Sequence, residues 1–275
     1  MIPLTLLYAP ADRPELVRKA LRGVADVVII DLEDAVAPDA KNAARAGLAE
    51  LLTGFEQRSV QVRVNAIGTP WAAADLAAVA GLPDAVEVRA PKVEGPEQVA
   101  RIAEASGGRP VHALLETPLA IERAFEIAGS GVASLGLGEA DLRSALGVMT
   151  VDDLGWQRAR VVNAAAAAGL GPPAMSVYAQ ITDTEGLAAS CRAGRAAGFL
   201  GRAAIHPRQL PVIVASFLPT PEEVERARRI VEGFVQATEA GGGTYVMPDG
   251  AFIDIAMIRA AQGVLALHAT HHASA

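Results

Sequence analysis

Two short apolar runs near the middle of the chain are each followed closely by an acidic residue. Val111 to Leu115 is followed by Glu116, and Ser134 to Gly138 by Asp141, with a helical pattern after each run. Parallel strands joined by crossover helices bring their carboxyl ends to one face, so carboxylates about 25 positions apart can meet in space. This order of strand, helix, strand and helix constrains the fold more than any other feature.

The same alternation extends over most of the chain. Apolar or β-branched runs of the kind found in buried parallel strands are followed by helical patterns. Eight such runs cover residues 4–8, 27–30, 61–64, 85–89, 111–115, 134–138, 172–177 and 201–205, the seventh with the poorest periodicity. No GxGxxG follows the first run and no phosphate loop is present, which disfavours an open doubly wound sheet. The sequence therefore predicts an α/β protein with a (β/α)8 TIM-barrel catalytic domain over residues 1–218.

A different pattern follows the predicted barrel. Thr220, Pro221 and Glu223 form a strong helix start, and a charged helical pattern runs from there to about Ala240. Residues 244–252 read as a small hairpin with its turn at 248–250, and a last helix is expected over 255–268. We expect residues 219–275 to be a C-terminal helical and hairpin extension that packs on the barrel or on a neighbouring subunit.

Composition excludes several classes of partner. The net charge of −7 over 275 residues gives no electrostatic footprint for nucleic acid or for an anionic membrane. Cys191 is the only cysteine, which excludes a disulfide within the chain and fits a reducing compartment. The amino-terminal residues lack the features of a signal peptide, and no run approaches the ~20 apolar residues of a membrane span. We expect a soluble, cytoplasmic protein that acts on a small molecule.

The carboxylates of Glu116 and Asp141 suit a divalent metal. Magnesium prefers oxygen ligands, usually takes one or two protein carboxylates, and leaves its other positions to water and substrate. Arg63, at the end of the third predicted strand, could hold a substrate carboxylate through two parallel hydrogen bonds. It could equally pair with Asp31 or Glu33, and both roles can hold at once. The sequence thus predicts a metal and carboxylate site at the strand ends.

Other polar residues are expected at the same face, among them Asp34, Asn65 and Glu139. Lys92 could neutralise a phosphate or an enolate oxygen, or form a salt bridge at the barrel rim. His206, just before a proline, is more typical of a structural hydrogen-bonding group than of a catalyst.

Eight segments along the chain, taken together, resemble one known family. They are YAPADRPE, VVIIDLEDAVAPDAKNAAR, VRVNAIGTPW, RAPKVE, LLETPLAI, LGLGEADL, AIHPRQL and TPEEVERARRIVEGF, in the right order from about residue 4 to 265. The segments are similar to those of the citrate lyase β-subunit group within the aldolase and citrate lyase family. That resemblance implies a magnesium-dependent (β/α)8 barrel that cleaves or forms a carbon–carbon bond next to a thioester or oxo acid. It also implies a homo-oligomer, a trimer or hexamer.

The resemblance implies roles for particular residues. Glu116 and Asp141 match the metal-ligating carboxylates, which also hold substrate through the metal, and Arg63 matches the arginine that grips the substrate carboxylate. Asp254, in AFIDIAMIRAA, matches a catalytic aspartate that thioester-cleaving relatives insert into a neighbouring subunit's site. Relatives often have a proline two residues later, where this chain has Ala256.

Four further residues lie where such relatives approach the thioester cofactor, and the resemblance implies that they bind coenzyme A (CoA). They are Asp12, Arg13, Lys41 and Arg45. The segment 173–178 lacks an acid that relatives often have there. Because that acid is absent, the sequence leaves the identity of the substrate open.

The expected activity is therefore a magnesium-dependent carbon–carbon lyase. Its expected substrate is a 3-hydroxy-3-carboxyacyl thioester of the citryl-CoA type, cleaved to oxaloacetate and an acetyl thioester. The alternatives are a malyl-CoA or citramalyl-CoA lyase, and a class II aldolase that makes pyruvate without CoA. A non-catalytic subunit that binds CoA or an acyl-carrier protein is a further alternative, although the metal-site acids have not been replaced by amides.

Overall fold

The computed structural model describes residues 3–239, 245–247 and 250–272 of the chain. The chain divides into two compact units, Ile2–Phe217 and Leu218–Ala275. We call the first the barrel unit and the second the C-terminal unit, and each is described by itself.

The barrel unit is built on one parallel sheet of seven strands in the order β6-β5-β4-β3-β2-β1-β7. The strands are β1 (Thr5–Pro10), β2 (Val27–Asp31), β3 (Val60–Arg63), β4 (Val86–Ala90), β5 (Val111–Leu115), β6 (Ser134–Leu137) and β7 (Arg202–Ala204). Each lies within about two residues of the run predicted from the sequence. Continuous apolar runs identify such strands well, because parallel strands are covered on both faces.

The predicted seventh strand is present only as two isolated bridges. Ala174 pairs with Gly136 of β6 and Met175 pairs with Arg202 of β7, both in parallel. Pro172 and Pro173 precede them and have no N–H to donate, which prevents a longer ladder. The segment nevertheless lies between the two edge strands, so the curled sheet is TIM-barrel-like with seven strands and one bridged position.

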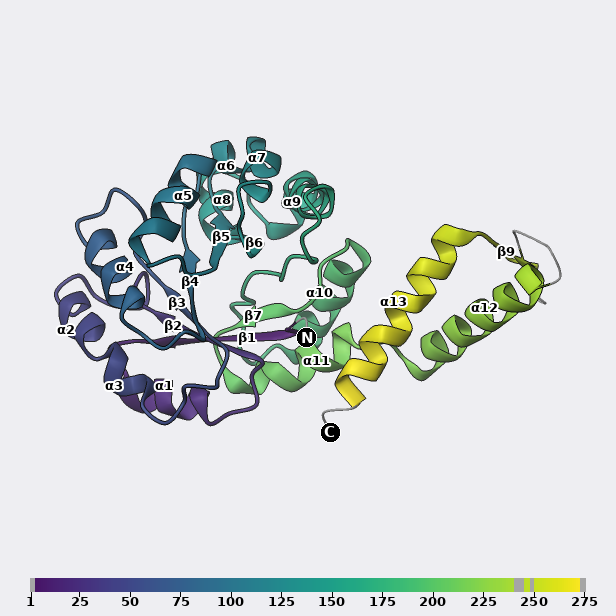
Figure 1. Ribbon diagram of the computed structural model, residues 1–275, viewed down its shortest axis with the longest axis horizontal. Coiled ribbons are helices and arrows are strands. Elements are labelled where there is room, and N and C mark those ends of the chain that lie inside the picture. The colour runs from purple at the N-terminus through teal and green to yellow at the C-terminus, as the bar shows by residue number, and fades with distance from the viewer. Residues whose placement is uncertain (1–2, 240–244, 248–249, 273–275) are drawn as a thin grey trace. The chain divides into compact units, whose positions relative to one another are not determined.

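Helices lie on the outside of this curled sheet (Figure 1). They are α1 (Pro14–Leu21), α2 (Lys41–Ala46), α3 (Leu48–Leu52), α4 (Ala72–Ala80), α5 (Pro96–Ala105), α6 (Pro118–Glu122), α7 (Ala124–Ala128), α8 (Glu139–Leu146), α9 (Gly155–Ala167), α10 (Thr184–Ala196) and α11 (Leu210–Phe217), with 3-10 turns η1 (Val151–Leu154) and η2 (Pro207–Gln209). The segment between β2 and β3 forms two short helices, α2 and α3, which are divided at Gly47, and glycine is a poor helix former.

The interior of the sheet has an apolar part and a polar part. Leu6, Val27, Ile29 and Ala203 form a buried apolar cluster on β1, β2 and β7. Polar side chains come instead from β3 to β6, where VQVR and VEVR alternate apolar and polar residues. Alternate residues of a strand face the same side, so these polar side chains share the interior.

The C-terminal unit contains α12 (Pro221–Glu239), the antiparallel pair β8 (Tyr245–Val246) and β9 (Phe252–Ile253), and α13 (Ile255–His272). Thr220 and Glu223 form the predicted reciprocal cap at the start of α12. The predicted hairpin is confirmed, although residues 248–249 of its turn lie outside the described part. A core of Ala227, Ile230, Met247, Ile253, Ile258 and Ala261 holds the unit together. The described residues include no helix long and apolar enough to cross a membrane.

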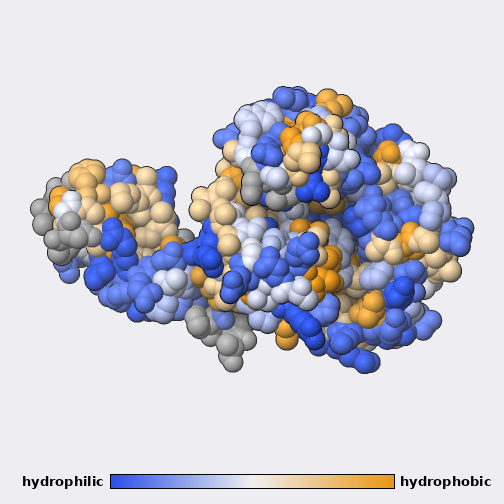
Figure 2. All heavy atoms as spheres, turned by 180° about the vertical axis from the view of Figure 1, so that it is seen from behind, coloured by the Kyte–Doolittle hydropathy of each residue, from blue (hydrophilic) through white to orange (hydrophobic). Residues whose placement is uncertain are grey.

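The visible surface of the barrel unit in Figure 2 is largely hydrophilic, with hydrophobic residues scattered in small patches. Scattered exposed apolar residues are normal for a folded chain and mark no site by themselves. The search for function therefore turns to the polar residues at the strand ends.

Candidate active site

Glu116 and Asp141 meet at the carboxyl ends of the strands, as predicted. Glu116 directly follows β5 and is 4% exposed, and Asp141 lies in the first turn of α8, after β6. A hydrogen bond joins their carboxyl groups, and the charges of Glu33 and Arg63 act on the same group. The strand-end placement of these two acids thus predicted that they meet, and the charge of Glu33 from the loop after β2 acts on them as well.

The electrostatics of this cluster are unfavourable for its acids. Burial, the hydrogen bond with Asp141 and the repulsion of Glu33 raise the pKa of Glu116 to about 8. Burial, only partly offset by Arg63, raises the pKa of Glu33 to about 7. One oxygen of Glu33, Oε2, is buried without a hydrogen-bond partner. Carboxyl groups whose pKa is raised in this way are typical of functional sites.

Gly138 makes room for the Glu116 side chain. A Cβ added at Gly138 would lie 2.3 Å from Glu116 Cγ and 2.6 Å from its Cδ. No side chain fits there, so a glycine at the end of β6 is required for Glu116 to occupy its position. This close approach is a local reason for the glycine in the LGLGEADL segment.

Arg63 is held by three acids from the loop after β2. Its Nε and one terminal nitrogen donate to Asp31 at 2.7 and 2.6 Å, and its other terminal nitrogen donates to Asp34 at 3.0 Å. That nitrogen also lies 2.9 Å from Glu33 Oε2. Burial opposes the charged guanidinium, but the hydrogen bond and charge of Asp31 outweigh it and raise the Arg63 pKa above its ordinary value. The ion pair anticipated from the sequence is present.

The two edges of the Arg63 guanidinium are held unequally. Asp31 is buried, whereas the Asp34 side chain is 64% exposed. Exposed ion pairs contribute little, about 0 to 1 kcal/mol, so Asp34 holds Arg63 more weakly than Asp31 does, although the nitrogen that donates to Asp34 also pairs with the buried Glu33.

Hydrogen bonds to its backbone fix the loop that carries these acids. Asp31 accepts the backbone N–H groups of Glu33 and Ala35 at 2.9 and 3.1 Å. Lys41 is buried and donates to the carbonyls of Leu32 and Glu33 at 2.7 and 2.6 Å. The Lys41 ammonium therefore sets the shape of the acidic loop.

Arg45 belongs to the same support. Its Nε donates to the fully buried Asp75 at 2.6 Å, and Asp75 accepts from Asn65, which also donates to the Leu32 carbonyl. Lys41 and Arg45 thus have protein partners that account for their charge. The expectation that they bind CoA stays a prediction.

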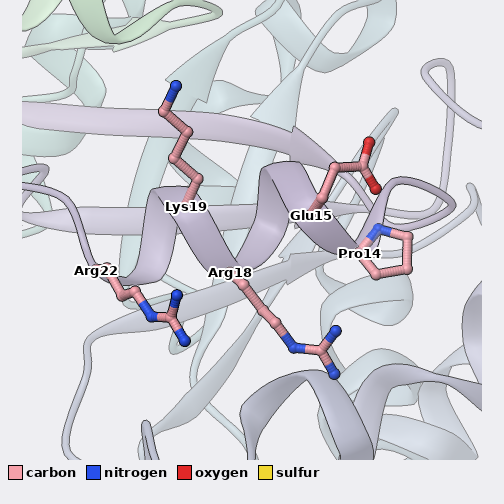
Figure 3. A pocket seen from close by; sticks show the side chains of 5 residues that line it. All are labelled: Pro14, Glu15, Arg18, Lys19 and Arg22. Carbon is pink, nitrogen blue, oxygen red and sulfur yellow. The ribbon is translucent and has the colours of Figure 1, made fainter.

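Asp12 and Arg13 lie at the start of α1, beside two hollows. One is lined by Asp12, Arg18, Glu50 and small residues of α2, and one oxygen of Asp12 is buried there without a hydrogen-bond partner. The other lies along α1, where Arg18, Lys19 and Arg22 project from the helix (Figure 3). Arg18 is paired with Glu50 at 2.9 Å, and the expected cofactor role of Asp12 and Arg13 stays a prediction.

Lys92 adds a cation to the cluster. Its Nζ lies 3.8 Å from Asp141 Oδ2, and its charge acts on Glu33. Lys92 has a φ of 52°, in the left-handed region that a side chain disfavours. Such strain is found where the surrounding structure requires a particular placement.

Two other strand-end residues have structural roles. His206 accepts the backbone N–H of Arg208 at 3.1 Å and caps η2, as its position before a proline suggested. Glu139, which is buried, accepts from Arg158 at 2.6 Å and from Ser176 at 2.7 Å. Both side chains thereby stabilise the strand-end loops.

Asp254 lies in the C-terminal unit. Its side chain is the cap of α13 and accepts the backbone N–H groups of Ala256 and Met257 at 2.9 and 3.0 Å. The residue is exposed. Its expected entry into a neighbouring subunit's site stays a prediction.

Sequence reasoning missed the polar side chains beneath Arg63, chiefly Tyr8, Gln61 and Arg89. Tyr8 lies under the Arg63 guanidinium at 5.0 Å, and Arg89 donates to both Tyr8 and Gln61. The alternation in VQVR and VEVR is the signal that could have found two of them, because it points polar residues into the sheet interior.

The donor set fits magnesium. Two carboxylates, open to solvent through Asp141, match an ion that takes few protein ligands and several waters. Within the described ranges no group of three or more His, Cys, Asp or Glu side chains is arranged to hold a metal ion. Glu116 and Asp141 would therefore supply two ligands, and water or substrate would supply the others.

A TIM-barrel-like sheet with paired carboxylates and a held arginine at its strand ends defines the class of protein as an α/β enzyme. Within that class, the chain belongs to the HpcH/HpaI aldolase/citrate lyase family, whose model matches residues 4–207. The membership expected from the eight motifs is confirmed.

Individual relatives sharpen the comparison. The chain is 36% identical to a (3S)-malyl-CoA thioesterase of Cereibacter sphaeroides, over 95% of this chain and 93% of that protein. It is 28% identical to the mitochondrial citramalyl-CoA lyase of Rattus norvegicus, over 95% and 85%. A crystal structure of CitE from Mycobacterium tuberculosis in complex with magnesium, acetoacetate and coenzyme A superposes with a TM-score of 0.82 at 33% identity, over 97% and 98%.

Proposed function

We propose that the protein is a magnesium-dependent carbon–carbon lyase that cleaves a 3-hydroxyacyl-CoA thioester into an oxo acid and an acyl-CoA. The observation that carries this proposal is the meeting of Glu116 and Asp141 beside Arg63 at the strand ends. The relatives support it, since they include citramalyl-CoA and malyl-CoA lyases and a CitE bound to magnesium and coenzyme A.

Glu116 and Asp141 would hold the magnesium ion. A divalent cation bound there would offset the repulsion between the two carboxyl groups, which gives a reason why the fold tolerates their proximity. Bound magnesium would polarise the oxygens of the substrate and stabilise negative charge that develops on them. The side chain of Glu33, which pairs with Arg63 at 2.9 Å, acts on this carboxylate pair through its charge.

Arg63 would orient the oxo-acid half of the substrate. Its inner edge stays with Asp31, and the substrate carboxylate takes the place of the exposed Asp34 on the outer edge. A planar guanidinium held on one edge presents the other at a fixed angle, which lowers the entropic cost of orienting the substrate.

The reaction then needs one proton acceptor. Removal of the proton from the 3-hydroxyl lets that oxygen form a carbonyl while the adjacent carbon–carbon bond breaks. The bonding electrons pass to the acyl thioester as an enolate, which takes a proton at carbon. Asp254, from a neighbouring subunit of the expected homo-oligomer, is the proposed acid and base. An assembly of three or six chains would satisfy this requirement.

The cationic face of α1 would meet the phosphates of CoA. Arg18, Lys19 and Arg22 project from it, beside the hollow that contains Asp12. The overall charge of −7 makes such a local concentration of basic groups necessary for an anionic cofactor.

Three thioesters fit the site, and they differ in the group attached to the reacting carbon. Malyl-CoA and citramalyl-CoA place one carboxylate on the oxo-acid half, which one arginine can hold. Citryl-CoA places two there, so it needs a second cation such as Lys92. The single held arginine favours malyl-CoA or citramalyl-CoA, and citryl-CoA, the substrate expected from the sequence, is the third candidate.

Thioester hydrolysis is the second candidate function, because the relatives at 34 to 36% identity are (3S)-malyl-CoA thioesterases. In that reaction water adds to the thioester carbonyl and the CoA thiolate leaves, so the carbon–carbon bond survives. A CoA-independent pyruvate aldolase and a non-catalytic CoA-binding subunit have no comparable observation in their favour.

The test incubates the purified protein with malyl-CoA, citramalyl-CoA and citryl-CoA, with and without magnesium, and identifies the products. Acetyl-CoA with glyoxylate, pyruvate or oxaloacetate supports the lyase, whereas free CoA with an intact hydroxy acid supports the thioesterase. Asp141→Asn is the control and should remove the activity. No magnesium-dependent product from any of the three would contradict the proposal.

A further inference from the structure

Tyr8 supports the face of the Arg63 guanidinium from within the sheet. The Arg63 Cζ atom lies 5.0 Å from the centre of the Tyr8 ring, and the Arg63 side chain is only 13% exposed. A guanidinium is attracted to an aromatic face, and the attraction grows when water is excluded. Asp31 fixes one edge of the planar cation, whereas Tyr8 fixes the plane itself.

Arg89 in turn holds the Tyr8 ring. Its Nε donates to the Tyr8 hydroxyl oxygen at 3.1 Å, and a terminal nitrogen donates to Gln61 Oε1 at 3.0 Å. Arg89 is 5% exposed, so neither bond competes freely with water. The Tyr8 ring is thereby fixed at both ends, by its backbone on β1 and by its hydroxyl.

Space for the Arg89 guanidinium is reserved across the sheet. A Cβ added at Gly136 on β6 would lie 3.2 Å from a terminal nitrogen of Arg89 and 2.8 Å from Leu114 Cδ2. Gln61 continues the network to Glu87, which also bonds His112 at 2.8 Å. Side chains from β1, β3, β4 and β5 therefore join in one network beneath Arg63.

We propose that Tyr8 and Arg89 are positioning residues that set the angle at which Arg63 presents its outer edge to a carboxylate. This inference rests on the proposed role of Arg63 in binding the oxo-acid half. Neither residue is required to touch the substrate. Their loss should weaken carboxylate binding more than it slows the bond-breaking step, and should leave magnesium binding unchanged.

The first test measures KM, kcat and the dissociation constant of the oxo-acid product for two Tyr8 variants. Tyr8→Leu removes the ring and should raise KM and the dissociation constant about tenfold, with a smaller change in kcat. Tyr8→Phe keeps the ring and should raise them no more than about threefold. Tyr178→Leu is the matched control, because Tyr178 also faces an arginine, Arg202 at 5.7 Å.

A KM that is unchanged in a folded Tyr8→Leu protein, or that rises equally in Tyr178→Leu, would overturn the proposal. If Tyr8→Leu does not fold, Arg89→Met provides the same test by removing the bond that fixes the ring. The magnesium midpoint, measured by calorimetry, serves as the readout that should stay constant.

A second readout needs no substrate. In protein labelled with 15N-arginine, the Arg63 Nε–H signal, assigned by its loss in Arg63→Lys, should exchange slowly with water. Tyr8→Leu should accelerate that exchange at least about tenfold, and unchanged protection would overturn the inference. If the wild-type protein binds no oxo acid, the proposed function fails while this measurement still decides the roles of Tyr8 and Arg89.

Discussion

The two ends of the barrel strands carry glutamates whose pKa values are shifted in opposite directions. At the carboxyl end, burial, a second acid and like charges raise the pKa of Glu116. Toward the amino end, the hydrogen bond from His112 lowers the pKa of Glu87 despite burial, and Gln61 adds a second bond. His112 is itself bonded to Ser134 at 2.7 Å. Both clusters lie along the same sheet, so the difference comes from their partners.

The comparison separates a structural polar cluster from a functional one. Polar groups that all have hydrogen-bond partners stabilise the fold without a bound ligand. Acids that repel each other cost stability and persist where a ligand repays that cost. Four predictions test this distinction.

The largest expected effect comes from replacing one glutamate at each end of the strands by glutamine. Glu116→Gln should lower kcat/KM at least about a hundredfold, because it removes a proposed metal ligand. Glu87→Gln should leave kcat/KM within about threefold while lowering the free energy of unfolding by about 1 to 3 kcal/mol. Steady-state assays and urea unfolding of both variants check this. Equal losses of activity would remove the functional distinction.

Gly138→Ala should lower kcat/KM by about a hundredfold. The new Cβ would meet Glu116 Cγ at 2.3 Å, so the carboxylate must move by about an ångström, a displacement that can cost this much. The matched control is Gly155→Ala, where an added Cβ meets nothing within 4 Å. Magnesium titration should show a weaker midpoint in Gly138→Ala alone, and an unaltered midpoint would place Glu116 outside the metal site.

The pH dependence of stability should have opposite signs at the two ends. Because the folded pKa of Glu116 is raised to about 8, its contribution to metal-free stability is lost as pH rises from about 4.5 through 8. The folded pKa of Glu87 is lowered, so its contribution is present above about 4.5 and lost at more acid pH. Urea unfolding in EDTA from pH 3 to 9 checks both signs. Glu116→Gln should flatten the alkaline loss, and Glu87→Gln the acid loss.

The smallest expected effect concerns the backbone at Lys92. Its φ of 52° is strained for any residue with a Cβ, so Lys92→Gly should be more stable than Lys92→Ala by about 1 kcal/mol, the reverse of the usual order. Both variants lose the ammonium beside Asp141 and should be about equally impaired in cleavage. A glycine variant less stable than the alanine one would show that the strain is absent in solution.

Much of the fold and of the site follows from local sequence. Apolar and β-branched runs, continuous in β1 and β2 and interrupted by polar residues in β3 to β6, locate these strands. The position after each run places Glu116, Asp141 and Arg63 at one end, because parallel strands all end on the same face. The seventh run was the weakest in the sequence and is the one reduced to two bridges.

What the sequence could not supply is the choice of partners. Lys41 and Arg45 carry charges that suit a phosphate, yet they bond the acidic loop and Asp75. Arg63 had two possible roles, and only the position of Asp31 beside it reveals the ion pair. A charge in a sequence indicates what a residue can bind, and folding determines which oxygen comes within 3 Å.

The motifs of the sequence identified the family, whereas its periodicity and strand direction predicted the parallel strands and the face on which the acids gather. Tertiary structure alone decided that Tyr8 and Arg89 lie beneath Arg63 and that Glu116 is buried against Asp141. The alternation of residues along a strand determines which face of the sheet a side chain lies on. The pairing register of neighbouring strands determines which side chains are in contact. Burial then sets the pKa of each carboxyl group, because desolvation depends on every element packed around it.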